Sequence, residues 1–168
     1  MLELKADERH QITFTLDGRE VRGFAEPRML LSDFLRYELG RSEVHVGCEQ
    51  GVCGSCTVLL EGKLARSCLT FAVQASGRRV ETVRSLSPIE GKLNDLQESF
   101  RRHHGLQCGY CTPGILVSSE AFLRDNARPS EPEVREMLSG HICRCTGYAG
   151  MVDAILETAQ QRATAISS

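Results

Sequence analysis

The sequence predicts an α+β protein with two domains, a strand-rich half over residues 1–84 and an all-α half over residues 85–168. Three observations lead to this prediction. Short alternating segments separated by glycine-containing turns fill the first half, whereas apolar residues at helical spacing dominate the second. Between the halves runs RSLSPIEGK, whose serine, proline and glycine residues are typical of a joint. At 168 residues the chain is long enough for two small hydrophobic cores.

Two hairpins and one helix make up the predicted first half. The segment QITFTL-DG-REVRGF indicates a hairpin with its turn at Asp17 and Gly18, because this dipeptide favours tight turns between strands. The apolar spacing of MLLSDFLRYEL predicts a helix over about residues 30–39, ended by a glycine. A second hairpin with its turn near Gly62 and a strand over residues 79–83 complete a small mixed sheet with one helix across it.

Four helices are predicted in the second half, beginning near residue 93, at Thr112, near residue 131 and after residue 147. Thr112 and Pro113 have the character of an N-cap and of the first residue of the second helix. In four helices of up-down order, the second and the fourth run parallel, so their N-termini lie at the same end. The second half is therefore predicted to be a four-helix bundle.

Charge and hydropathy argue against a nucleic-acid-binding protein, a secreted protein and a membrane-spanning protein. The formal net charge is -2 and the charges of both signs are interspersed, so the chain offers no basic face for nucleic acid. The N-terminal stretch MLELKADERH is charged and lacks the apolar run of a signal peptide. No apolar stretch approaches the length that spans a membrane. We therefore expect a soluble, cytoplasmic protein.

Eight cysteines are unusual in a cytoplasmic chain. A reducing cytosol disfavours disulfides, and the cysteines are grouped rather than scattered through apolar segments. The two groups are Cys48, Cys53, Cys56 and Cys68, and Cys108, Cys111, Cys143 and Cys145. Two sets of four thiolates are what two metal centres require, and structural disulfides are the alternative.

The first group indicates a cluster of iron and sulfide. Its sequence GCEQGVCGSC has the C-x4-C-x2-C spacing of plant-type [2Fe-2S] ferredoxins. The glycines between these cysteines allow the backbone to approach a cluster closely and to point N–H groups at its sulfides. Cys56 and Cys68 lie at equal distances from Gly62, so the second hairpin brings them to the same end. Cys68 is therefore the predicted fourth ligand.

The second group has C-x2-C, a long gap and C-x-C, which leaves zinc and an iron–sulfur cluster both open. Its two pairs precede the second and fourth predicted helices, whose N-termini offer N–H donors and partial positive charge to an anionic site. The intervening residues thus form a helical return that brings the two loops together. A Rieske centre is not expected, because C-x-H paired with C-x-x-H does not occur; His103, His104 and His141 are interpreted as surface residues or neighbours of the ligands.

These motifs occur together and in order along nearly the whole chain. GCEQGVCGSC, SC at 67–68, GLQCGYCTPG and CRCTGY jointly resemble the small iron–sulfur subunit of the xanthine dehydrogenase family of molybdenum hydroxylases. The resemblance implies a plant-type ferredoxin-like (β-grasp) domain followed by the four-helix-bundle domain. It also implies one [2Fe-2S] cluster in each domain. For the second group, where zinc and an iron–sulfur cluster were both open, the resemblance thus implies the cluster.

The resemblance further implies partners and a role. A large subunit would hold a molybdopterin cofactor and a medium subunit FAD, in a dimer of heterotrimers. This chain would pass single electrons from the molybdopterin centre through its two clusters to FAD, and it would hold no catalytic residue. Its general features suit N-heteroaromatic hydroxylases of the quinoline type, with aerobic carbon monoxide dehydrogenase as the alternative. A free-standing ferredoxin and a zinc-binding interaction module are the rival functions.

Carried over residue by residue, the resemblance assigns the first cysteine group to a distal cluster near FAD and the second group to a proximal cluster near the pterin. Gln107 and Cys145 are then expected to contact the pterin. Two residues depart from the family pattern: His141 stands where members often have Asn, and His45 is unusual before the first cysteine. We interpret both as surface variation, with altered hydrogen bonding around the sulfurs as the alternative.

Overall fold

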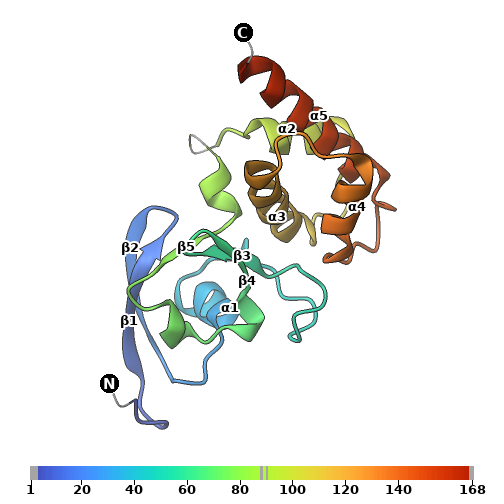
Figure 1. Cartoon of the computed structure of the whole chain (residues 1–168). Helices are drawn as coiled ribbons and strands as arrows, with labels where there is room; N and C mark the ends of the chain where they lie inside the picture. Colours follow the sequence, from blue (N-terminus) through green and yellow to red (C-terminus); the bar gives the residue numbers. More distant parts are fainter. Residues whose placement is uncertain (1–3, 88, 90, 167–168) are drawn as a thin grey trace.

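The computed structural model describes residues 4–87, 89 and 91–166, and its first half is built on a five-stranded mixed sheet (Figure 1). The strands are β1 (His10–Leu16), β2 (Arg19–Ala25), β3 (Thr57–Leu60), β4 (Lys63–Arg66) and β5 (Arg79–Glu81). They lie in the order β2-β1-β5-β3-β4. β1 and β5 are parallel, and the other neighbours are antiparallel.

Both predicted hairpins are present. Asp17 and Gly18 have φ angles of 49° and 80°, and Glu61 and Gly62 have φ angles of 53° and 76°. Two successive residues with positive φ match the right-handed twist of the flanking strands, so each turn closes directly into its ladder. The loop that carries the first three cysteines lies immediately before β3 and is therefore anchored to the second hairpin.

The predicted helix over residues 30–39 is present in altered form. α1 (Leu31–Asp33) passes directly into a π-helix (Phe34–Glu38), in which the N–H of Leu39 bonds the carbonyl of Phe34, five residues back. Apolar spacing over so short a segment does not distinguish this wider turn from an α-helical one. Leu31, Phe34 and Leu35 are fully buried against the sheet, in a core that also contains Ile12, Phe14, Leu16, Val58 and Val80.

Four helices occupy the second half: α2 (Asp95–Arg102), α3 (Thr112–Asp125), α4 (Glu131–Ser139) and α5 (Ala149–Ile166). The α+β class is thus confirmed. One predicted cap is wrong, because the N-cap of α3 is Cys111 and not Thr112. Cys111 already has helical angles, and its carbonyl accepts the N–H of Ile115, so the helix starts one residue early. The hydroxyl of Thr112 is consequently buried without a described partner.

The two halves are in contact through α3, which packs on β3 and β4 (Figure 1). Leu59 of β3 is buried with Val117 and Ala121 of α3. Pro88 and Glu90 of the predicted joint lie outside the described residues. No helix in the described part of the chain is long and apolar enough to cross a membrane.

Two candidate metal centres

The first cysteine group meets at the open end of the second hairpin. Cys48 and Cys53 lie in the loop before β3, Cys56 comes directly before the strand, and Cys68 follows β4. The N–H of Ser67 donates to the carbonyl of Cys56 over 3.3 Å, so the register is one residue away from the predicted alignment of Cys56 with Cys68. Besides burial, the thiol of Cys56 nevertheless lies close enough to raise the pKa of Cys68, so the predicted fourth cysteine lies with the others.

Main-chain donors surround the first sulfur of this group. The N–H of Cys53 points at the Cys48 sulfur over 3.3 Å, and the N–H groups of Gln50 and Val52 also face it. These hydrogen bonds lower the pKa of Cys48 to about 7, which favours the thiolate. Burial has the opposite effect on Cys68, whose pKa rises to about 11. Metal binding at this end must therefore displace a tightly held proton.

The second cysteine group meets at the N-terminus of α3. The sulfurs of Cys108 and Cys145 are 3.5 Å apart, and Cys111 contacts Cys143. Burial raises the pKa of Cys111 to about 12. Burial also acts to raise the pKa of Cys143, but hydrogen bonds from Thr146, from the main chain of Cys145 and from the Cys111 side chain together outweigh it and lower that pKa. The two distant pairs thus form one set of four thiols, as the helical return predicts.

Donor chemistry decides whether these sites fit an iron–sulfur cluster. All eight cysteines are free thiols, gathered in two sets of four. N–H groups directed at sulfur are what an anionic thiolate cluster needs. Within the described residues, no three His, Cys, Asp or Glu side chains are placed so that they would bind one single metal ion. The residues present therefore fit two clusters through thiol number and N–H donation.

The two cysteine loops touch each other. The N–H of Ile142 donates to the carbonyl of Cys53 over 3.0 Å. The ring of His45 stacks on that of Tyr110, with 4.5 Å between centroids, and its Nδ1 lies 2.7 Å from the Tyr110 carbonyl oxygen. The hydroxyl of Tyr110 donates to the carbonyl of Val46 over 2.8 Å. Each contact joins the neighbourhood of one cysteine group directly to that of the other.

The surface interpretation of His141 is wrong. Its side chain is 3% exposed, and its Nε2 lies 2.8 Å from the Ser118 hydroxyl. Burial, reinforced by the charge of Arg66, lowers the pKa of His141 to about 4, so the ring is neutral at neutral pH. Its Nδ1 faces Gly54 so closely that a Cβ there would overlap it. His45 is half-buried against the Tyr110 ring and is likewise no simple surface variation.

The sequence analysis did not predict a role for two residues at the junction, that is, at the contact between the two cysteine loops. Tyr110 lies inside the motif GLQCGYCTPG, so its place between two cysteines was an available signal. Arg66 had none, since its partner at the junction is 74 residues away: its guanidinium donates to the carbonyl of Gly140 over 2.8 Å.

Comparison with known proteins identifies the chain. A family described as a 2Fe-2S iron-sulfur cluster binding domain matches residues 14–84, and one described as a [2Fe-2S] binding domain matches residues 82–156. The caffeine dehydrogenase subunit gamma of Pseudomonas sp. (strain CBB1) is 46% identical, with 87% of this chain and 89% of that one covered. The nicotine 6-hydroxylase small subunit of Paenarthrobacter nicotinovorans is also 46% identical, with 92% of each covered. In the crystal structure of quinoline 2-oxidoreductase from Pseudomonas putida 86, one chain is 51% identical, with a TM-score of 0.89 over 94% of this chain and 97% of that one.

The chain belongs to the small iron–sulfur subunits of the xanthine dehydrogenase family of molybdenum hydroxylases. As such a subunit it binds two [2Fe-2S] clusters and forms part of an oxidoreductase complex. The predicted family, cluster type and enzyme class are confirmed. Zinc, which the second cysteine pattern alone left open, is thereby excluded.

The two residues of this iron–sulfur subunit that were predicted to contact a pterin lie side by side. The side-chain amide of Gln107 donates to the main-chain carbonyl of Cys145 over 3.0 Å. Gln107 and Cys108 are both exposed, so this edge of the second site faces outward. The amide oxygen of Gln107 makes no hydrogen bond to a described residue and stays available as an acceptor.

Proposed function

We propose that this subunit carries single electrons from a molybdopterin centre in a large subunit to FAD in a medium subunit. The first cysteine group holds the distal [2Fe-2S] cluster and the second group holds the proximal one. When bound, each cluster supplies one-electron chemistry between two cofactors that exchange electrons in pairs. The single observation that carries the proposal is the hydrogen bond between Ile142 and Cys53, which connects the two sets of thiols.

The connection is short in bonds as well as in space. Cys53 belongs to the first group, and Ile142 directly precedes Cys143 of the second. One hydrogen bond of 3.0 Å therefore joins the main chain of Cys53, a proposed ligand, to the main chain of Ile142, the residue before the proposed ligand Cys143. The His45–Tyr110 stack fixes the same two loops at a second point. The protein thus holds its two sites at a constant separation, as serial transfer requires.

Exposed apolar side chains beside each site support partner subunits on both sides. Val52 and Leu69, next to the first group, are both 60% exposed. Ile142 and Leu106, next to the second group, are 54% and 39% exposed. Exposed apolar residues that gather beside a functional site are a common feature of surfaces that partners cover. The first patch faces the FAD subunit and the second faces the molybdopterin subunit, in a dimer of heterotrimers.

The relatives support an N-heteroaromatic substrate for the complex. Caffeine, nicotine and quinoline, which appear in the names of three similar proteins, are all nitrogen heterocycles. The substrate binds in the large subunit, and this chain never touches it. Gln107 and Cys145 form its contact with the pterin, where the free amide oxygen accepts a hydrogen bond from the heterocycle.

Two domains carry the two clusters in this proposal, over residues 1–84 and 85–168. The second is a four-helix bundle, since α2 and α4 each pack against both α3 and α5. This arrangement holds the N-terminus of α3 against the loop before α5, where the four thiols of the second group meet.

Native mass spectrometry of the complex purified from its source organism tests the assignment. We expect a mass equal to two copies each of this chain, a molybdopterin-binding chain and an FAD-binding chain. Stopped-flow mixing with an N-heteroaromatic substrate should then bleach the iron–sulfur absorption before FAD is reduced. Recovery of this chain from its source organism without both partner chains, or FAD reduction that precedes the bleaching, would contradict the proposal.

A further inference from the structure

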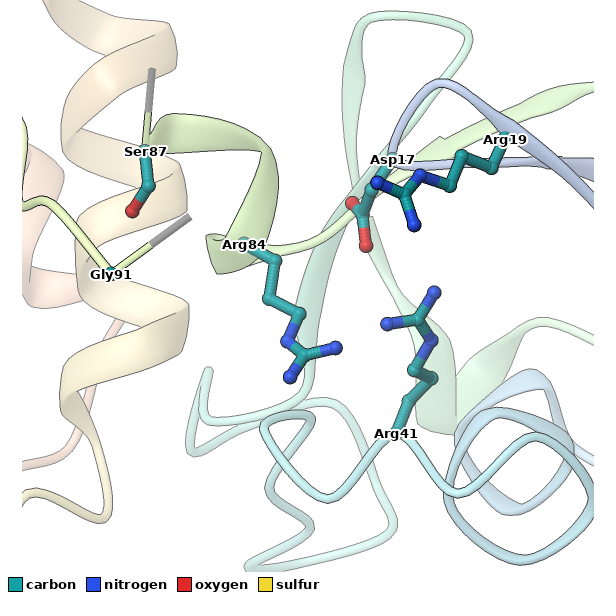
Figure 2. A pocket seen from close by; sticks show the side chains of 6 residues that line it. All are labelled: Asp17, Arg19, Arg41, Arg84, Ser87 and Gly91. Atoms are coloured by element: carbon teal, nitrogen blue, oxygen red, sulfur yellow. The ribbon is translucent and has the colours of Figure 1, made fainter. Parts of the chain in front are cut away.

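Away from the cysteine ligands, three arginines line a cavity of about 370 Å³. The cavity lies between the turn of the β1–β2 hairpin, the loop after the π-helix and a short 3-10 helix, η4 (Val83–Leu86). Its lining residues are Asp17, Arg19, Arg41, Arg84, Ser87 and Gly91. Figure 2 shows the guanidinium groups of the three arginines turned toward the same space from three separate segments of the chain.

These guanidinium groups lack close partners. Arg41 and Arg84 face one carboxylate oxygen of Glu43, at 4.0 and 3.7 Å, which is beyond hydrogen-bond length. The side chain of Arg19 forms no ion pair or hydrogen bond with a described residue, and the side chains of Arg41 and Arg84 donate no hydrogen bond within the same part of the chain. The side chain of Arg41 is nevertheless only 19% exposed. A cation so largely withdrawn from water normally has a closely bonded anion.

The carboxylate in the cavity wall does not fill this role. One oxygen of Asp17 accepts the main-chain N–H of Thr82 over 2.7 Å, and the other accepts the Thr82 hydroxyl over 3.0 Å. Burial raises the pKa of Asp17, and the Thr82 hydrogen bonds and the charge of Arg41 act against that rise. Three guanidinium charges therefore face two carboxylates: Asp17, whose oxygens accept hydrogen bonds from Thr82, and Glu43, which lies beyond hydrogen-bond length from Arg41 and Arg84. The cavity is left with net positive charge and many unused N–H donors.

We propose that this cavity is a binding site for a phosphate group, either free or carried by a small molecule. A planar carboxylate is satisfied by one bidentate arginine, whereas a tetrahedral phosphate presents oxygens in several directions. Three guanidinium groups that approach from a hairpin turn, a loop and a short helix match the second geometry. The volume of about 370 Å³ exceeds what one phosphate needs, which leaves room for the molecule attached to it.

Such a ligand acts on the joint between the two halves. Arg84 lies in η4, where the chain leaves β5 for the helical half, while Arg19 and Arg41 belong to the first half. A phosphate bound by all three ties η4 to the hairpin and to the loop after the π-helix. Bound phosphate therefore stabilises the folded chain, by a free energy that grows with the logarithm of its concentration relative to the dissociation constant.

Isothermal titration of the full chain with inorganic phosphate, and separately with ADP, tests this site at constant ionic strength. Arg84→Gln is the principal variant, because its side chain is 58% exposed and its loss should be tolerated. Arg19→Gln is the second, since Arg19 lies in an exposed position and has no described partner. Arg28→Gln is the matched control: Arg28 is 80% exposed and lies outside the cavity wall. Iron content is measured for every variant so that cluster loss is recognised separately.

We expect saturable binding of one phosphate per chain, weakened at least about tenfold by Arg84→Gln and by Arg19→Gln but not by Arg28→Gln. Binding of inorganic phosphate alone would identify the ligand as the free anion, and tighter binding of ADP would identify it as a nucleotide. Absence of saturable binding by both probes would overturn the proposal, as would an equal loss in the Arg28 control. Neither result bears on the cysteine sites, so the electron-transfer proposal stands or falls separately.

Discussion

The main-chain N–H of Ile142 donates a hydrogen bond to the carbonyl oxygen of Cys53 over 3.0 Å. The two residues belong to different halves of the chain, and each lies within a cysteine loop. The same junction brings Gly54 against His141, and leaves no room for a side chain at the glycine. The separation of the two metal centres is therefore set by direct contact between their loops.

Gly54→Ala should open this junction. A Cβ at this position would overlap the His141 ring and lie 2.8 Å from the carbonyl oxygen of Gly140, and its φ of +77° is unfavourable for alanine. We expect a loss of about 3 kcal/mol in the free energy of unfolding, from backbone strain and overpacking together. Gly62→Ala is the matched control, because Gly62 has a φ of +76° but no atom of the described residues within 4 Å of its Cβ position.

The control variant should lose only about 1 kcal/mol, the cost of the backbone conformation alone. Urea unfolding followed by circular dichroism measures both variants under the same conditions. Equal losses in the free energy of unfolding of Gly54→Ala and Gly62→Ala would show that the close packing of the junction does not contribute to stability.

Cys53→Ser should remove the distal cluster and leave the helical half folded. The substitution deletes one proposed ligand but keeps the main-chain carbonyl that accepts from Ile142. Iron content should fall by half, while the proximal cluster keeps its EPR signal. In the assembled complex, substrate should still reduce molybdenum, but FAD reduction should fail. Normal FAD reduction in this variant would disprove the serial order of transfer.

Gln107→Ala tests the proposed pterin contact. The side-chain amide of Gln107 donates to the carbonyl of Cys145. The substitution therefore removes this neutral hydrogen bond, and it also removes the amide oxygen that is proposed to accept a hydrogen bond from the pterin. We expect both clusters to remain, with cofactor binding weakened by about 1 kcal/mol or with slower electron transfer from molybdenum. Gln160→Ala, on the exposed face of α5, is the control. Molybdenum content and stopped-flow rates identical to those of the unaltered complex would refute the contact.

Glu157 should make the helical half sensitive to acid. Hydrogen bonds from Ser99, and then from Arg102, lower its pKa from 4.5 to about 2. Because the folded-state pKa is depressed, the stabilisation is complete above pH 4.5 and is lost as the pH falls toward about 2. Urea unfolding of Glu157→Gln and of the unaltered chain should thus differ most at neutral pH and converge at low pH. Glu136→Gln, on the exposed face of α4, should show no such convergence.

Local chemistry was predictable from the sequence and contact across the halves was not. The turn at Gly62 and the C-x4-C-x2-C loop follow from residues close together in the chain, and the meeting of the two later cysteine pairs follows from the order of the helices between them. The buried state of His141 depends on Ser118, and the tight approach to it depends on Gly54, both distant in sequence. The π-helix after Asp33 was hidden for a different reason, since its apolar pattern fits an α-helix equally well.

The binding of two adjacent clusters by the eight cysteines is tested most directly by a reductive titration of the purified chain, with iron and sulfide analysis and EPR at each step. The two thiol sets differ in setting, one beside a hairpin and one at a helix N-terminus, so their N–H donation and exposure differ. We expect about four irons and four sulfides per chain, and two distinct S = 1/2 signals that broaden each other as both sites become reduced. A single signal, or half that amount of iron, would contradict two adjacent clusters held by these eight cysteines.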